Sequence, residues 1–485
     1  MRINSSEKMV TKTDSLRPNQ KQRIQLLTEA AVERHQNGQL EAANLIYETI
    51  LEIDPVNVFV LQLLGVLASQ LGQHDVSLNL LNKAISLKPD YADALNNRGI
   101  VLKEIGSFNK ALEDFNKAIK LKPDDFEILN NRGIVLTKLN YAKKALADFD
   151  KAISLNPDNT YAYNNRGNAL KSLHRFDEAL DDYSKALSLK PDNHEAQQGI
   201  IQLLAEHEPK RFENSPFVKA NKAIKEIFHK SHVSTSFSDE DVLTLLSNAL
   251  NILKKLDLRV KTTQSQIFRQ NSVDLNCKRH FSVFERYNII PAFCFGCFKV
   301  EIKPRSVIEL IKLFIIFDQL KLDENNTRKC MVELREKISG FYKGLIYCSS
   351  PEQAFDIADR LQPIIEKTIG SKLPVTVKRG CSEYSIAFPD YGTIDQNSEK
   401  LMVYKDSWRL TEKIHDREYP NIDSGGRRLN LNGLTLNDIL IIQNWVSYAR
   451  GIGDFSCEGV NGELANNKNF YDPAVQRLKH YTYSV

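Results

Sequence analysis

A run of five 34-residue repeats between Ile24 and Asn193 constrains the fold of this chain more than any other feature. The clearest part, residues 92–193, repeats nearly the same sequence three times, from ALNNRGIVLKEIGSFNKALEDFNKAIKLKPD to AYNNRGNALKSLHRFDEALDDYSKALSLKPD. Two weaker copies precede these three. Equivalent residues recur in step, as Gly99, Gly133 and Gly167; Ala111, Ala145 and Ala179; Phe115, Phe149 and Tyr183; and Pro123, Pro157 and Pro191.

The spacing of these residues predicts pairs of packed helices. Small residues at the glycine and alanine positions allow two helix backbones to cross closely, and the large residue four positions after the alanine fills space between neighbouring units. Gly38, Gly72, Gly106 and Asn140 stand where a left-handed residue ends the first helix, and a proline ends each second helix. Because one repeat cannot bury its own apolar stripe, we expect the units to stack into a right-handed superhelix with a concave groove.

The repeat resembles the tetratricopeptide repeat, a helix–turn–helix unit of 34 residues. The resemblance covers about a third of the chain, residues 24–193. It implies an all-α solenoid of five repeats plus a capping helix. It also implies that a protein or peptide partner binds in the groove.

Length and charge limit the remaining possibilities. A chain of 485 residues is too long for one core, so two or three domains are expected. The net charge of +4 does not indicate a nucleic-acid or membrane partner. The first 20 residues have no apolar signal segment, and no run of 18 apolar residues predicts a membrane span. We therefore expect a cytoplasmic protein.

The chain divides into five predicted segments. A polar and disordered N-terminus precedes the repeats, and a capping helix with two bridging helices follows them. An α+β domain and a helical extension complete the chain. The segments are residues 1–20, 24–193, 194–256, 257–395 and 396–485.

The pattern of apolar residues in the α+β domain predicts the order β-α-β-β-α-β, typical of the ferredoxin-like sandwich. The expected elements are a strand at 293–302, a helix at 305–319, strands at 330–335 and 342–348, a helix at 351–370 and a strand at 374–381. A fifth strand is possible at 382–389. Helical stretches near 398–415 and 434–451 and an irregular tail follow.

Paired asparagines recur in the last three repeats, as Asn96 and Asn97, Asn130 and Asn131, and Asn164 and Asn165. The resemblance implies that the second of each pair faces the groove, similar to the asparagine ladder in the repeats of O-GlcNAc transferase. An amide both donates and accepts hydrogen bonds, so it can bind a peptide backbone of any sequence. The alternative is that these side chains only solvate an exposed helix face.

An arginine follows each asparagine pair, and an aspartate recurs 16 residues later; the residues are Arg98, Arg132 and Arg166 with Asp114, Asp148 and Asp182. The arginines are candidate anion ligands in the groove. A repeated pairing of opposite charges favours instead ion pairs between helices that set the register of the repeats.

All seven cysteines lie beyond residue 270, and five fall at ends of the predicted strands. In the predicted topology these ends meet at one edge of the sheet. Cys294, Cys297, Cys348 and Cys381, with Cys330 as a spare, are therefore candidate ligands of zinc or of an iron–sulfur cluster. The alternative is that they fill the core as small apolar residues, and residues 294 and 297 would point to opposite faces of a regular strand.

Two functions follow from these features. The first is a scaffold that binds a peptide segment through the asparagines. The alternative is an enzyme whose repeats recruit a protein substrate to a metal- or thiol-containing site in residues 257–395. Weaker candidates are Glu383 and His415–Asp416 as acid–base groups, and residues 341–348 as a remote match to an RNA-recognition strand.

Overall fold

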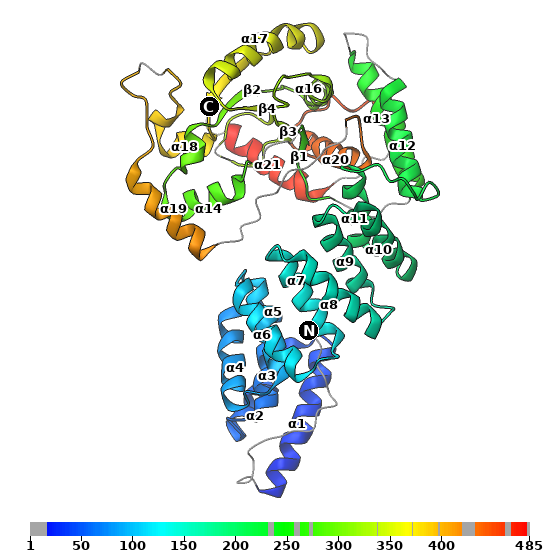
Figure 1. Cartoon of the computed structure of the whole chain (residues 1–485), viewed down its shortest axis with the longest axis vertical. Helices are drawn as coiled ribbons and strands as arrows, with labels where there is room; N and C mark the ends of the chain where they lie inside the picture. The colour runs from blue at the N-terminus through cyan, green and yellow to red at the C-terminus, as the bar shows by residue number, and fades with distance from the viewer. Residues whose placement is uncertain are drawn as a thin grey trace. The chain divides into compact units, whose positions relative to one another are not determined.

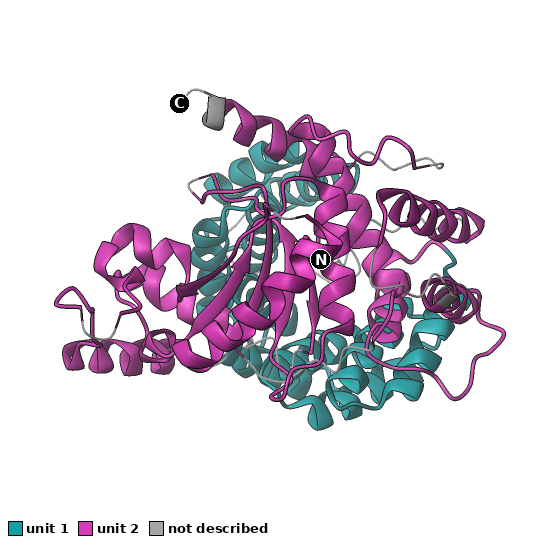
Figure 2. Ribbon diagram, turned by 90° about the horizontal axis from the view of Figure 1, so that it is seen from above, with its two compact units in different colours: residues 1–191 teal, residues 192–485 magenta. Residues whose placement is uncertain are grey.

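A computed structural model describes residues 17–230, 237–256, 262–270, 275–336, 338–370, 372–395, 398–419, 432–460 and 467–482. The chain forms two compact units, residues 1–191 and 192–485, coloured separately in Figure 2. Most of the N-terminal segment predicted to be disordered, residues 1–16, lies outside the described residues. The last part of that segment belongs to the first helix, which begins at Pro18.

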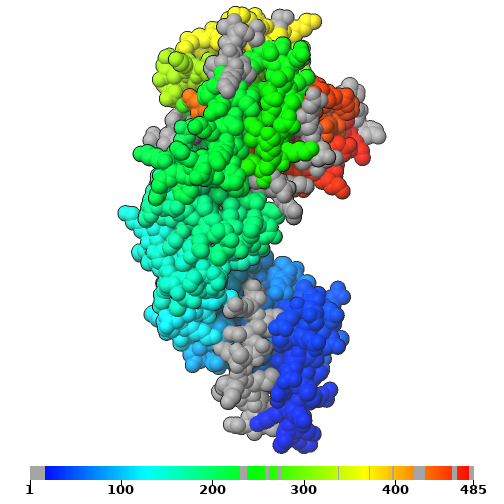
Figure 3. All heavy atoms as spheres, turned by 90° about the vertical axis from the view of Figure 1, so that its right-hand side faces the viewer, coloured from blue at the N-terminus to red at the C-terminus, as the bar shows by residue number. Residues whose placement is uncertain are grey.

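The first unit consists of five antiparallel helix pairs, one for each repeat (Figure 1). In the space-filling view the repeats follow one another in chain order (Figure 3). The pairs are α1 (Pro18–Gln36) and α2 (Leu40–Ile53), α3 (Val58–Gln70) and α4 (His74–Leu87), α5 (Ala92–Glu104) and α6 (Phe108–Leu121), α7 (Phe126–Lys138) and α8 (Ala142–Leu155), and α9 (Thr160–Ser172) and α10 (Phe176–Leu189).

The small residues of the repeat allow close helix crossing, as predicted. A Cβ atom built at Gly133 would lie 2.6 Å from the ring of Phe149 in the second helix of the same repeat, so a larger residue there would force the helices apart. The equivalent Phe115 also packs with Ile128 of the next repeat. Left-handed backbone ends the first helix at Asn140 (φ 62°) and at its equivalents Gly38, Gly72 and Gly106.

The repeated arginines and aspartates form bidentate ion pairs, so the structural interpretation of these residues is confirmed. Arg132 in α7 donates to both carboxylate oxygens of Asp148 in α8, at 2.7 and 2.8 Å. The same guanidinium donates to Asn116 in α6 of the preceding repeat at 3.0 Å. Each arginine therefore links three helices. The equivalent pairs are Arg98–Asp114 and Arg166–Asp182.

The second unit is built around a five-stranded antiparallel sheet with the order β1-β3-β4-β2-β5. Its strands are β1 (Gln266–Arg269), β2 (Phe298–Ile302), β3 (Arg328–Val332), β4 (Tyr342–Cys348) and β5 (Val375–Arg379). The central pairing sets Val300 opposite Ile346 and Lys299 opposite Tyr347. Because side chains alternate along a strand, Val300 faces the core and Lys299 faces the other side.

Helices cover one face of this sheet and share one apolar core with it. The α16 helix (Val307–Gln319), α17 (Pro351–Thr368) and α20 (Leu436–Gly451) provide most of this cover, with α21 (Lys468–Thr482) behind. The predicted capping and bridging helices join the same core; they are α11 (His194–Leu204), α12 (Pro216–Lys230) and α13 (Asp239–Lys255). The predicted divisions at residues 256 and 395 therefore fall inside one compact unit.

A buried cluster of ion pairs connects α20 to the edge strand β1 of the sheet. Arg269 of β1 donates to Asp318 at the end of α16 at 2.5 Å and to Asp438 of α20 at 2.7 Å. All three side chains are at most 5% exposed. Paired in this way, the charges avoid the large cost of leaving one of them unneutralised in the core.

The second unit corrects three of our expectations. Residues 292–295 form one helical turn, α15, before β2, because Pro291 precedes the segment. Residues 382–389 are no fifth strand: Ser382–Ala387 is the short helix α18, followed by the 3-10 turn η2 (Pro389–Gly392). The tail is the helix α21 instead of irregular chain. Its Arg477 donates to the carbonyl groups of Arg335, Ile338 and Gly340 in the β3–β4 connection.

The opposite face of the sheet lies near two helices, of which the sequence predicted only the second, near residues 398–415. They are α14 (Cys277–Tyr287) and α19 (Asp406–Glu418). Arg279 of α14 joins them through ion pairs with Glu412 and Asp416. A second apolar cluster forms here around Tyr384 and Tyr391.

Candidate functional site

The asparagines of the repeats form hydrogen bonds to one another across repeats. Asn131 donates to Asn96 at 3.3 Å, and Asn165 donates to Asn130 at 3.1 Å. Asn97 and Asn164 are buried, with 3% and 4% of their surface exposed. Four of the six predicted residues are thus partly exposed and arranged as two hydrogen-bonded pairs.

The helices that carry these asparagines lie close together. Among the ten described helices of the repeats, α3 contacts α5, α5 contacts α7 and α7 contacts α9, each the first helix of its repeat. The second helices make few such contacts with one another. In a stacked array the more closely spaced helices lie on the inner side of the curve. This arrangement places the asparagines on the side of the array where a groove is expected.

The cysteines of the second unit separate onto the two faces of the sheet. Cys330 and Cys348 belong to the helix-covered core and are 1% and 6% exposed. Three of the predicted ligands lie on the other side with Cys277, where they line one small cavity of about 10 Å³; they are Cys294, Cys297 and Cys381. Among the described residues, no three His, Cys, Asp or Glu side chains are close enough to hold a metal ion.

The predicted set of four metal ligands is therefore not brought together. Cys348 lies opposite Phe298 in the register, and both side chains point toward the core. The single helical turn before β2 directs Cys294 away from the sheet, where its thiol lies 3.8 Å from the hydroxyl of Tyr384. Cys277, which lies outside the predicted strands, borders the same cavity as Cys381.

A much larger pocket, of about 720 Å³, occupies the open face of the sheet. Its floor is formed by alternate residues of all five strands, and α14 forms the opposite wall. Residues spaced four apart on one face of α14, Cys277, Phe281 and Glu285, line this wall. A volume of this size is typical of small-molecule sites.

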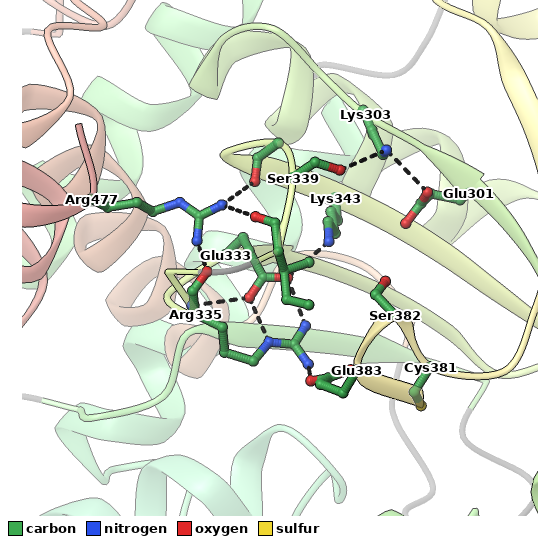
Figure 4. A network of polar contacts seen from close by, with 12 residues as sticks. Glu301, Lys303, Glu333, Arg335, Ser339, Lys343, Cys381, Ser382, Glu383 and Arg477 are labelled. Carbon is green, nitrogen blue, oxygen red and sulfur yellow. Dashed lines mark hydrogen bonds and ion pairs between the residues drawn. The ribbon is translucent and has the colours of Figure 1, made fainter. Parts of the chain in front are cut away.

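One end of the pocket is a balanced network of charges. Glu333 accepts from Lys343 at 2.9 Å and from Arg335 at 2.6 Å, and Arg335 also reaches Glu383 (Figure 4). These contacts place Glu383, a predicted acid–base candidate, in an ion pair. Burial lowers the pKa of Lys343 to about 8 although Glu333 favours its charged form.

The other end carries positive charge without a carboxylate partner. Among the described residues, Lys299 of β2 and Lys329 of β3 form no ion pair with Asp or Glu. Lys299 is only 3% exposed, and its ammonium lies 3.1 Å from the sulfur of Cys381. Both lysines also lie near the ring of Tyr347, with ammonium-to-centroid distances of 5.0 and 5.9 Å.

These charges change the acidity of the neighbouring groups. Burial alone would raise the pKa of Cys381, but the ammonium groups of Lys299, Lys329 and Lys378 outweigh it, so the pKa lies below that of an ordinary thiol. Burial, together with repulsion from Lys299, lowers the pKa of Lys329 to about 8. Burial raises the pKa of Cys277 to about 11 and that of Cys294 still further. Cys381 is thus the one thiol of these three that favours the thiolate.

A serine and a histidine also meet at the pocket wall. Ser282 of α14 lies 2.9 Å from Nε2 of His415, which is fully buried in α19. Asp416 lies 3.5 Å from Nδ1 of His415, but its carboxylate is held by Arg279. Nδ1 of His415 has no hydrogen-bond partner among the described residues, so the arrangement lacks the bond that histidine donates to aspartate in a nucleophilic triad. We conclude that this pair fastens α14 to α19.

Comparisons with known families identify residues 69–193. Models described as tetratricopeptide repeat match residues 92–125, 126–159 and 160–193, and a model described as TPR repeat matches residues 69–106. Residues 69–193 are tetratricopeptide repeats. No family model matches the second half of the chain. Tetratricopeptide repeats support a role as a protein-interaction scaffold.

Several solved structures resemble about a third of the chain. YrrB, titled a TPR protein with an unusual peptide-binding site, is 22% identical, with coverage of 36% of this chain and 89% of that one and a TM-score of 0.31. MamA is 24% identical, with coverage of 35% and 92% and a TM-score of 0.31. PilF of Pseudomonas aeruginosa is 20% identical, with coverage of 38% and 84% and a TM-score of 0.36.

No curated protein matches the chain. No helix in the described part of the chain is both long and apolar enough to cross a bilayer.

Sequence reasoning identified the tetratricopeptide repeats but missed the residues that line the pocket. Lysine alternates with apolar residues in the strand segments FKVEI, RKCMV, YKGLIYC and VTVKR. This alternation places Lys299, Lys329, Lys343 and Lys378 on one face of the sheet. The alternating lysines indicate a cationic face of the sheet. The sequence analysis instead interpreted the cysteines of the same segments as metal ligands.

Proposed function

We propose that the protein is an interaction scaffold whose tetratricopeptide repeats bind an extended peptide segment of a partner through Asn96, Asn130, Asn131 and Asn165. The observation that carries the proposal is the row of partly exposed amides on the closely spaced first helices. Each amide has hydrogen-bonding capacity beyond its bond within the pair, so it can accept from or donate to a peptide backbone. The buried Asn97 supports the helix packing instead of contacting the peptide.

A peptide-display experiment tests this proposal. Peptides selected from a random library on the immobilised full chain are measured against the double variant Asn131→Ala/Asn165→Ala. We expect the affinity to fall about thirtyfold, because two hydrogen bonds of roughly 1 kcal/mol each are lost. Asn109→Ala, at an exposed position of α6, is the matched control and should bind as the parent does.

Two outcomes would contradict the scaffold. One is a selection that enriches no peptide. The other is an equal affinity of the parent and the double variant for the enriched peptides. Circular dichroism of both variants shows whether the helices remain intact, because the substitutions also remove the bonds to Asn96 and Asn130.

We also propose that residues 298–379 form a ferredoxin-like sandwich to which β1 adds an edge strand. The strand neighbours β3-β4-β2-β5 and the two crossover helices α16 and α17 support this assignment. A cytoplasmic location remains part of the proposal. It would suit the seven cysteines, which are all free thiols in the structure.

One observation favours a second function, an enzyme whose repeats recruit a protein substrate to a thiol site. Cys381 borders the pocket, and the ammonium of Lys299 stabilises its thiolate. A thiolate of this kind is the reactive form of cysteine. Brief treatment of the full chain with iodoacetamide at neutral pH, followed by peptide mass spectrometry, should modify Cys381 faster than the other six cysteines. Modification of Cys457 or Cys330 at an equal rate would remove the basis for this function.

A further inference from the structure

The lysines at one end of the pocket point to a ligand that no part of the scaffold function requires. Lys299 and Lys329 lie on the two strands that flank β4, and both ammonium groups lie near the ring of Tyr347 of that strand. Neither lysine has a carboxylate partner among the described residues. Two ammonium groups this close repel each other, and burying them is costly. An arrangement of this kind is stabilised when an anion binds between the two charges.

The rest of the wall indicates what the anion carries. Phe268 and Phe281 border the pocket on opposite sides, with Met331 and Leu345 on its floor. These side chains suit an apolar or aromatic body, and the pocket volume of about 720 Å³ suits a small molecule. The charged network around Glu333 closes the far end, where Lys343 and Arg335 are already neutralised.

We propose that this pocket binds a small molecule that joins a carboxylate or phosphate group to an apolar or aromatic body, with its anion held between Lys299 and Lys329. Both lysines are anchored on a rigid sheet, in strands β2 and β3 that pair with opposite sides of β4, so their charges are already positioned before the ligand arrives. The sulfur of Cys381, 3.1 Å from Lys299, would then lie beside the bound anion.

The proposal rests on the pocket and not on peptide binding by the repeats. It adds a ligand class to the thiol site but does not require Cys381 to react. A reactive Cys381 without any anion binding would leave the thiol function standing and overturn the anion site. Anion binding without a reactive Cys381 would support the anion site and overturn the thiol function.

Calorimetric titration of the full chain tests the site. The probes are benzoate and phenyl phosphate, with benzyl alcohol as the uncharged control and inorganic phosphate to detect binding of the anion alone. We expect one site per chain for at least one of the two aromatic anions, and no saturable binding of benzyl alcohol. Binding of inorganic phosphate with equal affinity would show that the apolar wall contributes nothing and would overturn that part of the proposal.

Variants locate the site. Lys299→Met and Lys329→Met keep the length of each side chain and remove its charge, and each should weaken binding at least about tenfold, as expected when a charged hydrogen bond is lost. Lys367→Met, at an exposed position in the last turn of α17, is the matched control. Equal affinity in the three variants would overturn the proposed position, as would the absence of saturable binding of any anionic probe to the parent.

A measurement on the parent chain covers the case in which Lys299→Met does not fold. A bound anion raises the pKa of the neighbouring thiol and also shields it, so phenyl phosphate or benzoate should slow alkylation of Cys381 by iodoacetamide. Cys457, which lies outside the lining of the pocket, is the internal control. Unchanged alkylation of Cys381 at saturating probe would contradict the site.

Discussion

The ammonium of Lys299 lies 3.1 Å from the sulfur of Cys381, on the face of the sheet that the core helices leave open. Lys299 belongs to β2, and Cys381 lies two residues after β5, the antiparallel neighbour of β2. Their contact couples two charges that would each be unfavourable if buried alone. It is the clearest chemical feature of the second unit.

The first prediction concerns the acidity of Cys381. The rate of its alkylation, followed against pH by peptide mass spectrometry, should reach half its maximum below the pKa of an ordinary thiol, because Lys299, Lys329 and Lys378 favour the thiolate over the effect of burial. Lys299→Met should move this midpoint upward, and Lys367→Met should not. A midpoint at or above that of a free cysteine in the parent would contradict the charge assignment.

The second prediction is that anion affinity falls as pH rises through about 8. Burial and then Lys299 lower the pKa of Lys329 to about 8, so its charge is present below that pH and lost above it. The groups that face Lys329 are Lys299, Cys277, Cys381 and Arg335, and a thiolate at Cys381 acts in the same direction by repelling the anion.

Benzoate is the suitable probe because it stays ionised throughout this range. Its dissociation constant, measured by calorimetry between pH 6.5 and 9, should be constant at first and then increase. In Lys329→Met the remaining binding should depend less on pH. A parent affinity that is flat across the range would show that Lys329 does not contact the anion.

The third prediction concerns the ion pairs of the repeats. Asp148→Ala removes the bidentate partner of Arg132 and should destabilise α7 and α8 by about 2 kcal/mol, typical of hydrogen bonds to a charged group. Hydrogen–deuterium exchange of the full chain measures this loss locally. Lys143→Ala, at an exposed position of the same helix, should leave exchange unchanged. Equal protection in both variants would show that the pair contributes no stability.

The fourth prediction concerns metal. Because no three suitable side chains converge in the described residues, removal of metal by a chelator should leave the thermal unfolding of the second unit unchanged. Elemental analysis of the anaerobically purified protein is the accompanying measurement. Zinc or iron at about one atom per chain, with lower stability after chelation, would restore the four-cysteine site that the sequence predicted.

The repeats show how much of a fold can be read from a sequence. Helix bounds, turns and the pairing of Arg132 with Asp148 follow from residues at most 34 positions apart, and the same local solution recurs in each repeat. Contacts in a solenoid lie within one unit or between neighbours. The spacing of residues in the sequence of a repeat therefore predicts which of them are in contact.

In the second unit the sequence by itself determined the central β-α-β-β-α-β order but gave no indication of β1 or α14. β4 lies at the predicted residues, and α16 and α17 agree with the predicted helices within two residues. Periodicity determined these elements because apolar residues recur every second position in strands and every third or fourth in helices. It did not separate a fifth strand from α18, since a short apolar segment fits both.

Only the tertiary structure decided which side chains meet. Cys348 and Lys299 come from paired strands, yet one faces the core and the other the pocket. Cys348 pairs with Phe298, the neighbour of Lys299, and successive side chains of a strand point to opposite faces. One wall of the pocket is formed by α14, and no pattern in the neighbouring sequence indicates that this helix packs over the sheet. The sequence showed thiols and lysines along each strand, whereas the pairing of strands far apart in the chain placed Lys299 against Cys381 and left Cys348 in the core.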